Sequence, residues 1–166
     1  ICGAVKGAGM VAPNMATTLL FLTTDVKISR PLLTRALKKA VGDTLNKLTV
    51  DGHQSTNDTA ILLSSGLASN RPVITVGPEY RRFERGLTEV CDGLTRMAGL
   101  DAEGSTRLFK VEIKGAATAK QAGQAARAIA DYPLVKCAVH GIDPNWGRII
   151  CAVGSCGVKL ESTRLT

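Results

Sequence analysis

The stretch KGAGMVAPNMATTLLFLTTD, residues 6–25, raises the main question of this sequence. It begins as a glycine-rich loop, is interrupted by Pro13 and ends in a short β-branched and apolar run at residues 17–25. Such a run is typical of a buried strand. Two adjacent threonines, Thr17 and Thr18, stand where the loop passes into the strand. They are either ordinary strand residues, or one of them is chemically active.

The glycines imitate a dinucleotide-binding loop. Residues 7–12 match G-x-G-x-x-A, and Asp25 follows at the end of the predicted strand. In that motif, however, the glycines follow a strand and open a helix. Pro13 and Asn14 break any helix here, so the match is rejected. The glycines are then available to give the loop a strained or closely approaching backbone.

A threonine directly after such a loop has a known chemical use. Its hydroxyl is a weak nucleophile unless a base is adjacent, and cleavage of the preceding peptide bond supplies one in the new α-amine. The ordinary pKa of that amine is about 8, which suits a general base near neutral pH. The residues alone leave both interpretations open: Thr17 as an N-terminal nucleophile, or both threonines as strand residues.

Beyond this stretch, helix and strand patterns mix without a strict βαβ repeat, which indicates one α+β layered unit. Helices are predicted from a Ser29 cap to about Leu45, over 78–98 and over 118–130. The 78–98 helix carries an apolar stripe of Phe83, Leu87, Val90, Cys91, Leu94, Met97 and Ala98. Further strands are predicted at 60–65, 107–115, 134–139 and 148–154, with a loop at 140–147.

Composition excludes several classes of protein. Of 166 residues, 45% are hydrophobic and 21% charged, and no apolar run is long enough to span a membrane. The net charge is +7, but the basic residues are dispersed and lack interleaved aromatics, so we expect no nucleic-acid partner. The first residues do not resemble a signal peptide, and the absence of an initial Met suggests a fragment or a processed chain.

The five cysteines show no CxxC spacing, and only His53 and His140 could join them in binding a metal. We therefore predict reduced, buried thiols in a cytoplasm-like compartment and no metal site.

Five blocks carry a family resemblance. They are KGAGMVAPNMAT at 6–17, TTD at 23–25, STNDT at 55–59, EGSTR at 103–107 and HGIDPNWGRI at 140–149. With these blocks, in this order, the chain resembles the ornithine acetyltransferase family, the bifunctional glutamate N-acetyltransferases of arginine biosynthesis.

The resemblance implies a self-processing enzyme with an α+β layered sandwich of helices and mixed sheet, similar to N-terminal-nucleophile enzymes. Such a precursor cleaves itself into α and β chains that stay together, usually as an α2β2 heterotetramer. The new N-terminal threonine takes the acetyl group of N-acetylornithine and passes it to glutamate. Some members also accept acetyl-CoA, and no metal or bound organic cofactor is implied. The implied location is the cytoplasm, or an organelle matrix in a eukaryote.

Mapped onto this chain, the resemblance implies cleavage between Ala16 and Thr17, with Thr17 as both catalytic and substrate-binding residue. Lys6 is implied to bind a substrate carboxylate, and Glu103 the cationic amine of ornithine. Residues 1–16 would end the α segment, and 17–166 would form a β-chain acyltransferase domain that is incomplete at its C-terminus. His140 is not expected to be catalytic, and residues 55–58 are expected near the site without an assigned step.

The chain differs from the family pattern in two respects. Many members carry Met after the nucleophile, where this chain has Thr18, and Thr18 should point to the opposite face of the strand from Thr17. The family's oxyanion-hole residues are implied to lie upstream of this sequence. Two alternatives remain: a self-processing aminopeptidase or amidohydrolase with water as acceptor, and a non-catalytic domain that is never cleaved.

Overall fold

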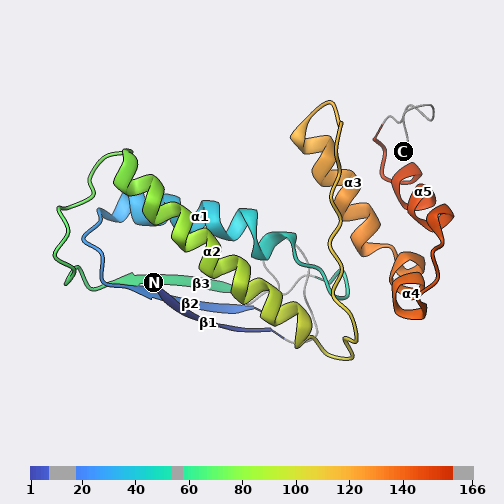
Figure 1. Ribbon diagram of the computed structural model, residues 1–166, viewed down its shortest axis with the longest axis horizontal. Coiled ribbons are helices and arrows are strands. Elements are labelled where there is room, and N and C mark those ends of the chain that lie inside the picture. Colours follow the sequence, from blue (N-terminus) through green and yellow to red (C-terminus); the bar gives the residue numbers. More distant parts are fainter. Residues whose placement is uncertain (8–17, 54–57, 159–166) are drawn as a thin grey trace. The chain divides into compact units, whose positions relative to one another are not determined.

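The computed structural model describes residues 1–7, 18–53 and 58–158. Instead of one layered unit, the chain forms two compact units, Ile1–Ser105 and Thr106–Thr166, each with its own apolar core (Figure 1). The proposed division between residues 16 and 17 lies outside the described residues.

Unit 1 contains a three-stranded mixed sheet in the order β1-β2-β3. The strands are β1 (Cys2–Lys6), β2 (Leu19–Thr24) and β3 (Thr59–Ser64). β1 pairs antiparallel with β2, and β2 pairs parallel with β3. The strand prediction at 17–25 is confirmed with shorter bounds, and that at 60–65 is confirmed with bounds one residue earlier. β1 was not predicted.

Two helices pack on one face of this sheet (Figure 1): α1 (Arg30–Asp43), which the short 3₁₀ turn η1 (Leu45–Lys47) follows, and α2 (Pro78–Leu100). Each helix begins with a proline in its first turn, where the missing N–H costs nothing, and both helix predictions are confirmed. Leu20 and Leu22 of β2 are 1% exposed beneath the helices, whereas Phe21 between them is 47% exposed. Within the described residues of unit 1, the face that carries Phe21 is not covered by a helix.

Unit 2 is built from three helices: α3 (Ala119–Asp131), α4 (Pro133–Gly141) and α5 (Trp146–Gly154). Thr118 caps α3 by accepting the Gln121 N–H, as is usual for a threonine at this position. The predicted helix at 118–130 is confirmed. The core of unit 2 contains Ala125, Ile129, Val135, Ala152 and Val153.

Three predicted strands in unit 2 are wrong. Residues 134–139 lie in α4 and 148–154 in α5. The loop predicted at 140–147 is shorter at both ends, because His140 and Gly141 still belong to α4 and Trp146 and Gly147 already belong to α5. Short apolar runs cannot be assigned by periodicity alone, and buried Val135 and Ala138 in fact have helical spacing. Residues 107–115 do alternate in burial, but they form no strand because the described part of unit 2 offers no partner strand.

The side chains also differ from expectation at a few positions. All five cysteines are free, but only Cys91 is buried, while Cys2, Cys137 and Cys151 are exposed. On α2 the stripe includes Tyr80, 1% exposed, whereas Met97 is 64% exposed. No helix in the described residues is long and apolar enough to cross a membrane.

Candidate active site

The predicted nucleophile Thr17 and its cleavage partner Ala16 lie outside the described residues. The candidate site is therefore described through the residues around them: Lys6, Thr18 and Asp58 at one end of the sheet, and Glu103 in the loop after α2.

Lys6 lies at the end of the sheet where β2 begins. It is the last residue of β1, and the register pairs Lys6 with Leu19 and Leu19 with Thr59. The carboxyl end of β1 and the amino ends of β2 and β3 therefore meet there (Figure 1). Lys6 is exposed, so its ammonium is available to an anion in solvent.

Thr18, directly before β2, is held on both sides of its backbone. Its N–H donates to Oδ1 of Asp58 at 2.9 Å, and its carbonyl accepts the N–H of Thr59 at 3.1 Å. The residue is 6% exposed. A Cβ added at Gly7 would lie 3.1 Å from Oγ1 of Thr18, so a side chain at position 7 would crowd it. Thr18 is thus a fixed, buried residue next to the predicted nucleophile in the chain.

Asp58 was expected near the site, but no step was assigned to it. Besides the bond to Thr18, its second oxygen, Oδ2, is shielded from solvent and has no hydrogen-bond partner within residues 1–7, 18–53 and 58–158. No sequence pattern indicates this contact, because it depends on the parallel pairing of β2 with β3, which brings the residue before one strand beside the residue before the other.

Glu103 lies in a tight turn after α2. Gly104 adopts φ +70°, and the Ser105 N–H donates to the Ala102 carbonyl at 2.9 Å. Glu103 itself is exposed. Helix α2 packs along β1. A Cβ added at Gly86 of α2 would lie 3.9 Å from Ile1, next to the start of β1, and a Cβ added at Gly3 of β1 would lie 2.9 Å from Leu94, further along α2.

The order of these contacts shows that β1 and α2 run in the same direction, so they finish at the same end of unit 1 (Figure 1). The turn that carries Glu103 thus follows α2 at the end of unit 1 where Lys6 lies. An exposed basic and an exposed acidic side chain therefore belong to the same end of unit 1.

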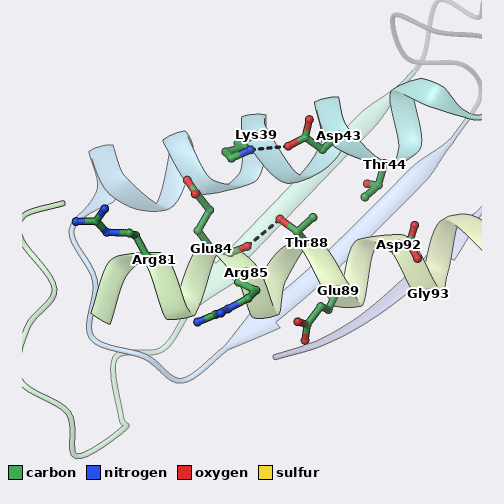
Figure 2. Close-up of a pocket in the computed structure, with 10 residues that line it drawn as sticks. All are labelled: Lys39, Asp43, Thr44, Arg81, Glu84, Arg85, Thr88, Glu89, Asp92 and Gly93. Atoms are coloured by element: carbon green, nitrogen blue, oxygen red, sulfur yellow. Dashed lines mark hydrogen bonds and ion pairs between the residues drawn. The ribbon is translucent and has the colours of Figure 1, made fainter. Parts of the chain in front are cut away.

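A surface groove of unit 1 lies elsewhere, between α1 and α2 (Figure 2). Its volume is about 680 Å³, and none of the predicted site residues lines it. Its walls carry both signs of charge, and Lys39 and Asp43 bind each other across 2.6 Å. The hydrogen bond from Lys39 lowers the pKa of Asp43 and that to Asp43 raises the pKa of Lys39. Such internally paired, open surfaces are common between packed helices, and we assign it no ligand.

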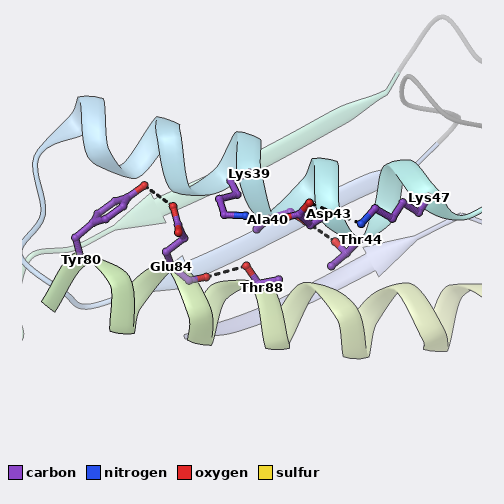
Figure 3. A network of polar contacts seen from close by, with 8 residues as sticks. All are labelled: Lys39, Ala40, Asp43, Thr44, Lys47, Tyr80, Glu84 and Thr88. Carbon is purple, nitrogen blue, oxygen red and sulfur yellow. Dashed lines mark hydrogen bonds and ion pairs between the residues drawn. The ribbon is translucent and has the colours of Figure 1, made fainter. Parts of the chain in front are cut away.

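A polar network borders this groove (Figure 3). Tyr80 donates its hydroxyl to Oε1 of Glu84 at 2.8 Å, and Thr44 donates to the carbonyl of Ala40 at 2.7 Å. Burial, followed by the hydrogen bond to Glu84, raises the pKa of Tyr80 to about 12. Both bonds join residues four positions apart, one within α2 and the other at the end of α1, so each stabilises its own helix.

In unit 2, the HGIDPNWGR block has contacts typical of a structural role. Arg148 donates to the carbonyl of Leu134 at 2.9 Å and lies 3.9 Å from the Asp143 carboxylate. His140 Nδ1 lies 3.0 Å from the Thr106 hydroxyl at the surface. In the described ranges, no group of three or more His, Cys, Asp or Glu residues could hold a metal ion.

These features define an α+β protein in which one end of a small mixed sheet gathers a lysine, a buried threonine and an aspartate. The model of the ArgJ family matches residues 1–166, and the chain belongs to that family.

Similar proteins agree with this assignment. The chain is 46% identical over 161 residues to the arginine biosynthesis bifunctional protein ArgJ of Shouchella clausii, covering 97% of this chain and 40% of that protein. It is 48% identical over 162 residues to the protein of the same name from Dehalococcoides mccartyi, covering 97% and 40%. A crystal structure of arginine biosynthesis bifunctional protein ArgJ from Bacillus halodurans matches with a TM-score of 0.81 and 41% identity, over 85% of this chain and 66% of that one. The chain spans about two fifths of the length of these curated relatives.

Proposed function

We propose that this chain carries the self-processing and acetyl-transfer residues of an enzyme that moves acetyl from N2-acetylornithine to L-glutamate in arginine biosynthesis. Membership of the ArgJ family and the names of the similar proteins support the pathway. The observation that carries the proposal is the sheet end where Lys6 pairs with Leu19, the residue directly after the anchored Thr18.

Processing begins at the Ala16–Thr17 bond. The Thr17 hydroxyl attacks the Ala16 carbonyl carbon, the acyl group moves from nitrogen to oxygen, and water hydrolyses the resulting ester. Ala16 ends as a carboxylate, and Thr17 gains a free α-amine. This amine is the general base that an N-terminal threonine needs.

Transfer follows in two halves. The amine takes the hydroxyl proton as Oγ of Thr17 attacks the acetyl carbonyl, and it returns the proton to the departing amine of ornithine. In the second half the amino group of glutamate attacks the acetyl-threonine ester, so N-acetylglutamate leaves and the hydroxyl is restored. A negatively charged tetrahedral intermediate forms in each half, and oxyanion-hole donors stabilise such species.

Lys6 and Glu103 bind the two ends of the substrates. The ammonium of Lys6 pairs with the α-carboxylate, and the carboxylate of Glu103 pairs with the side-chain ammonium of ornithine. Acetyl-CoA is a further donor candidate, and no metal or bound cofactor takes part. The processed chains form an α2β2 heterotetramer in the cytoplasm, or in an organelle matrix if the source is eukaryotic.

Thr17→Ala in the full-length protein tests the proposal, with acetyl transfer from N-acetylornithine to glutamate as the assay. The variant should remain uncleaved and inactive, since the change removes the nucleophile of both reactions. Full activity in this variant would refute the mechanism.

Lys6→Ala separates binding from chemistry. We expect KM for N-acetylornithine to rise by about tenfold or more, because one charge-assisted contact is lost, while kcat changes less. Lys27→Ala is a matched control, since Lys27 is a lysine of unit 1 outside the predicted site. An unchanged KM in Lys6→Ala would remove Lys6 from the site.

Two alternatives make different predictions. A self-processing aminopeptidase or amidohydrolase would pass the acyl group to water, so acetate would form faster than N-acetylglutamate. A non-catalytic domain would keep the Ala16–Thr17 bond intact in the purified protein.

A further inference from the structure

Asp58 has a buried carboxylate oxygen that the chemistry above does not use. Asp58 lies in the STNDT block and directly precedes β3. Oδ1 accepts the Thr18 N–H at 2.9 Å, and Oδ2 is without a hydrogen-bond partner in the described part of the chain. A carboxylate oxygen that is buried without a donor is costly, so its presence needs a reason.

Pairing of the strands does not supply that reason. β2 and β3 pair over six residues each, and the bond from the Thr59 N–H to the Thr18 carbonyl extends the same ladder. The register is therefore held by the backbone, and a neutral acceptor would be enough to satisfy the Thr18 N–H. Pairing of β2 with β3 therefore does not explain why this position carries a carboxylate with a second, unbonded oxygen.

The Thr18 nitrogen, whose N–H donates to Asp58, is covalently connected to the predicted nucleophile Thr17. The Thr18 nitrogen belongs to the peptide group that joins Thr17 to Thr18. Three bonds separate it from the α-nitrogen of Thr17, and standard bond lengths keep these two nitrogens within about 4 Å of each other. The carboxylate of Asp58 is therefore in the neighbourhood of the nitrogen that cleavage would release.

We propose that Asp58 is a positioning residue for the N-terminal threonine: Oδ1 fixes the Thr17–Thr18 peptide group, and Oδ2 accepts a hydrogen bond from the free α-amine of Thr17. This inference rests on the proposed function. An amine held through one N–H has its lone pair oriented, which favours proton transfer from the neighbouring hydroxyl. The negative charge of Asp58 also favours the protonated amine, so it raises the pKa of that amine.

The test uses the full-length protein with Asp58→Asn, which keeps the size of the side chain and an acceptor for Thr18 but removes the charge. Asp92→Asn, the same change at an exposed acid of α2 that pairs with Arg96, is the matched control. Thr17→Ala is measured alongside. Cleavage is followed by intact mass, and folding is followed by thermal melting. The kinetic constants kcat and KM are measured over a range of pH, and rates are divided by the concentration of β chain that can be acetylated.

For Asp58→Asn we expect kcat to fall by about a hundredfold while KM changes little, as for a misplaced catalytic group. The acidic limb of the kcat/KM profile should move to lower pH, since the neutral amine would persist there. Lys6, Glu103 and the Asp51–His53 pair, which are charged groups at this end of unit 1 and in the loop before β3, are unchanged in both variants, so their effects cancel. Asp92→Asn should match the parent protein.

Each other outcome has one meaning. Parental kcat and pH profile in Asp58→Asn, with Thr17→Ala inactive, would overturn the role of Asp58 and leave the proposed function standing. Activity in Thr17→Ala would overturn both. If Asp58→Asn is not cleaved, parental melting supports a role at Thr17, whereas a clearly lower melting temperature identifies Asp58 as a structural brace and overturns the inference.

Discussion

Thr18 and Thr17 are adjacent in sequence but have different expected roles. Thr18 is 6% exposed, and its backbone N–H and carbonyl bond to Asp58 and Thr59. These contacts explain Thr18 as a packed residue at the start of a strand. The proposed nucleophile is the residue before it, which needs a free hydroxyl.

Matched substitutions separate the two threonines. Thr18→Val keeps the branched shape and the backbone bonds, so we expect cleavage and acetyl transfer to persist. Thr17→Val should abolish both reactions. Intact mass and a transfer assay on the full-length variants decide this, and loss of cleavage in Thr18→Val alone would show that the nucleophile had been assigned to the wrong threonine.

At the residue scale, the predicted site residues come from sequence motifs and not from composition or periodicity. Lys6 and Glu103 are exposed charges that composition and periodicity cannot distinguish from ordinary surface residues, and only the family motifs single them out. Asp58 lies inside one of these motifs, yet its contact with Thr18 joins residues 40 positions apart. Such a contact follows only from the pairing of β2 with β3, which the sequence does not reveal.

At the element scale, long periodic segments were predicted well and short apolar ones were not. α2 has 23 residues and a clear stripe, whereas α4 and α5 have nine each. Over nine residues, a β-branched apolar run fits a helix or a buried strand equally well. Packing decides: α3, α4 and α5 bury their apolar residues against each other, and the described part of unit 2 holds no strand for them to pair with.

Two glycines give opposite predictions for the same substitution. Gly93 lies inside α2 with open space where a methyl group would be added, so Gly93→Ala should raise stability by about 0.5–1 kcal/mol. A Cβ at Gly3 of β1 would lie 2.5 Å from Leu22 and 2.9 Å from Leu94, so Gly3→Ala should lower stability by about 1–3 kcal/mol. Urea unfolding measures both, and a destabilised Gly93→Ala would contradict the described packing of α1 and α2.

The contact between α1 and α2 should also weaken in alkali. The pKa of Tyr80 is raised to about 12 in the fold and is 10.0 without it, so the unfolded chain loses this proton first. Stability is therefore fully present below pH 10 and falls as pH rises toward 12, by at most about 1.4 kcal/mol per pH unit. Buried Cys91, with its pKa raised to about 11, adds a similar loss that begins near pH 9.

Tyr80→Phe isolates the tyrosine contribution. In urea unfolding between pH 10 and 12, this variant should lose stability less steeply than the parent, and the Cys91 contribution should remain. Equal slopes in the two proteins would show that Tyr80 titrates normally.

At the scale of the whole molecule, the chain belongs to the ArgJ family, and the residues discussed above lie at one end of its sheet and in the turn after α2. The α+β class was predictable from the mixture of patterns, whereas the division into two units was not, because strands wrongly predicted in unit 2 made the chain look like one α+β layered unit. The chain covers 40% of the length of its curated relatives, so the proposed reaction is to be tested on the full-length protein.

Intact mass spectrometry of the purified full-length protein shows directly whether Thr17 becomes an acetyl-accepting N-terminus. We expect two chains, with the second beginning at Thr17 and gaining one acetyl group on incubation with N-acetylornithine alone. A single uncleaved chain that still transfers acetyl to glutamate would contradict this expectation.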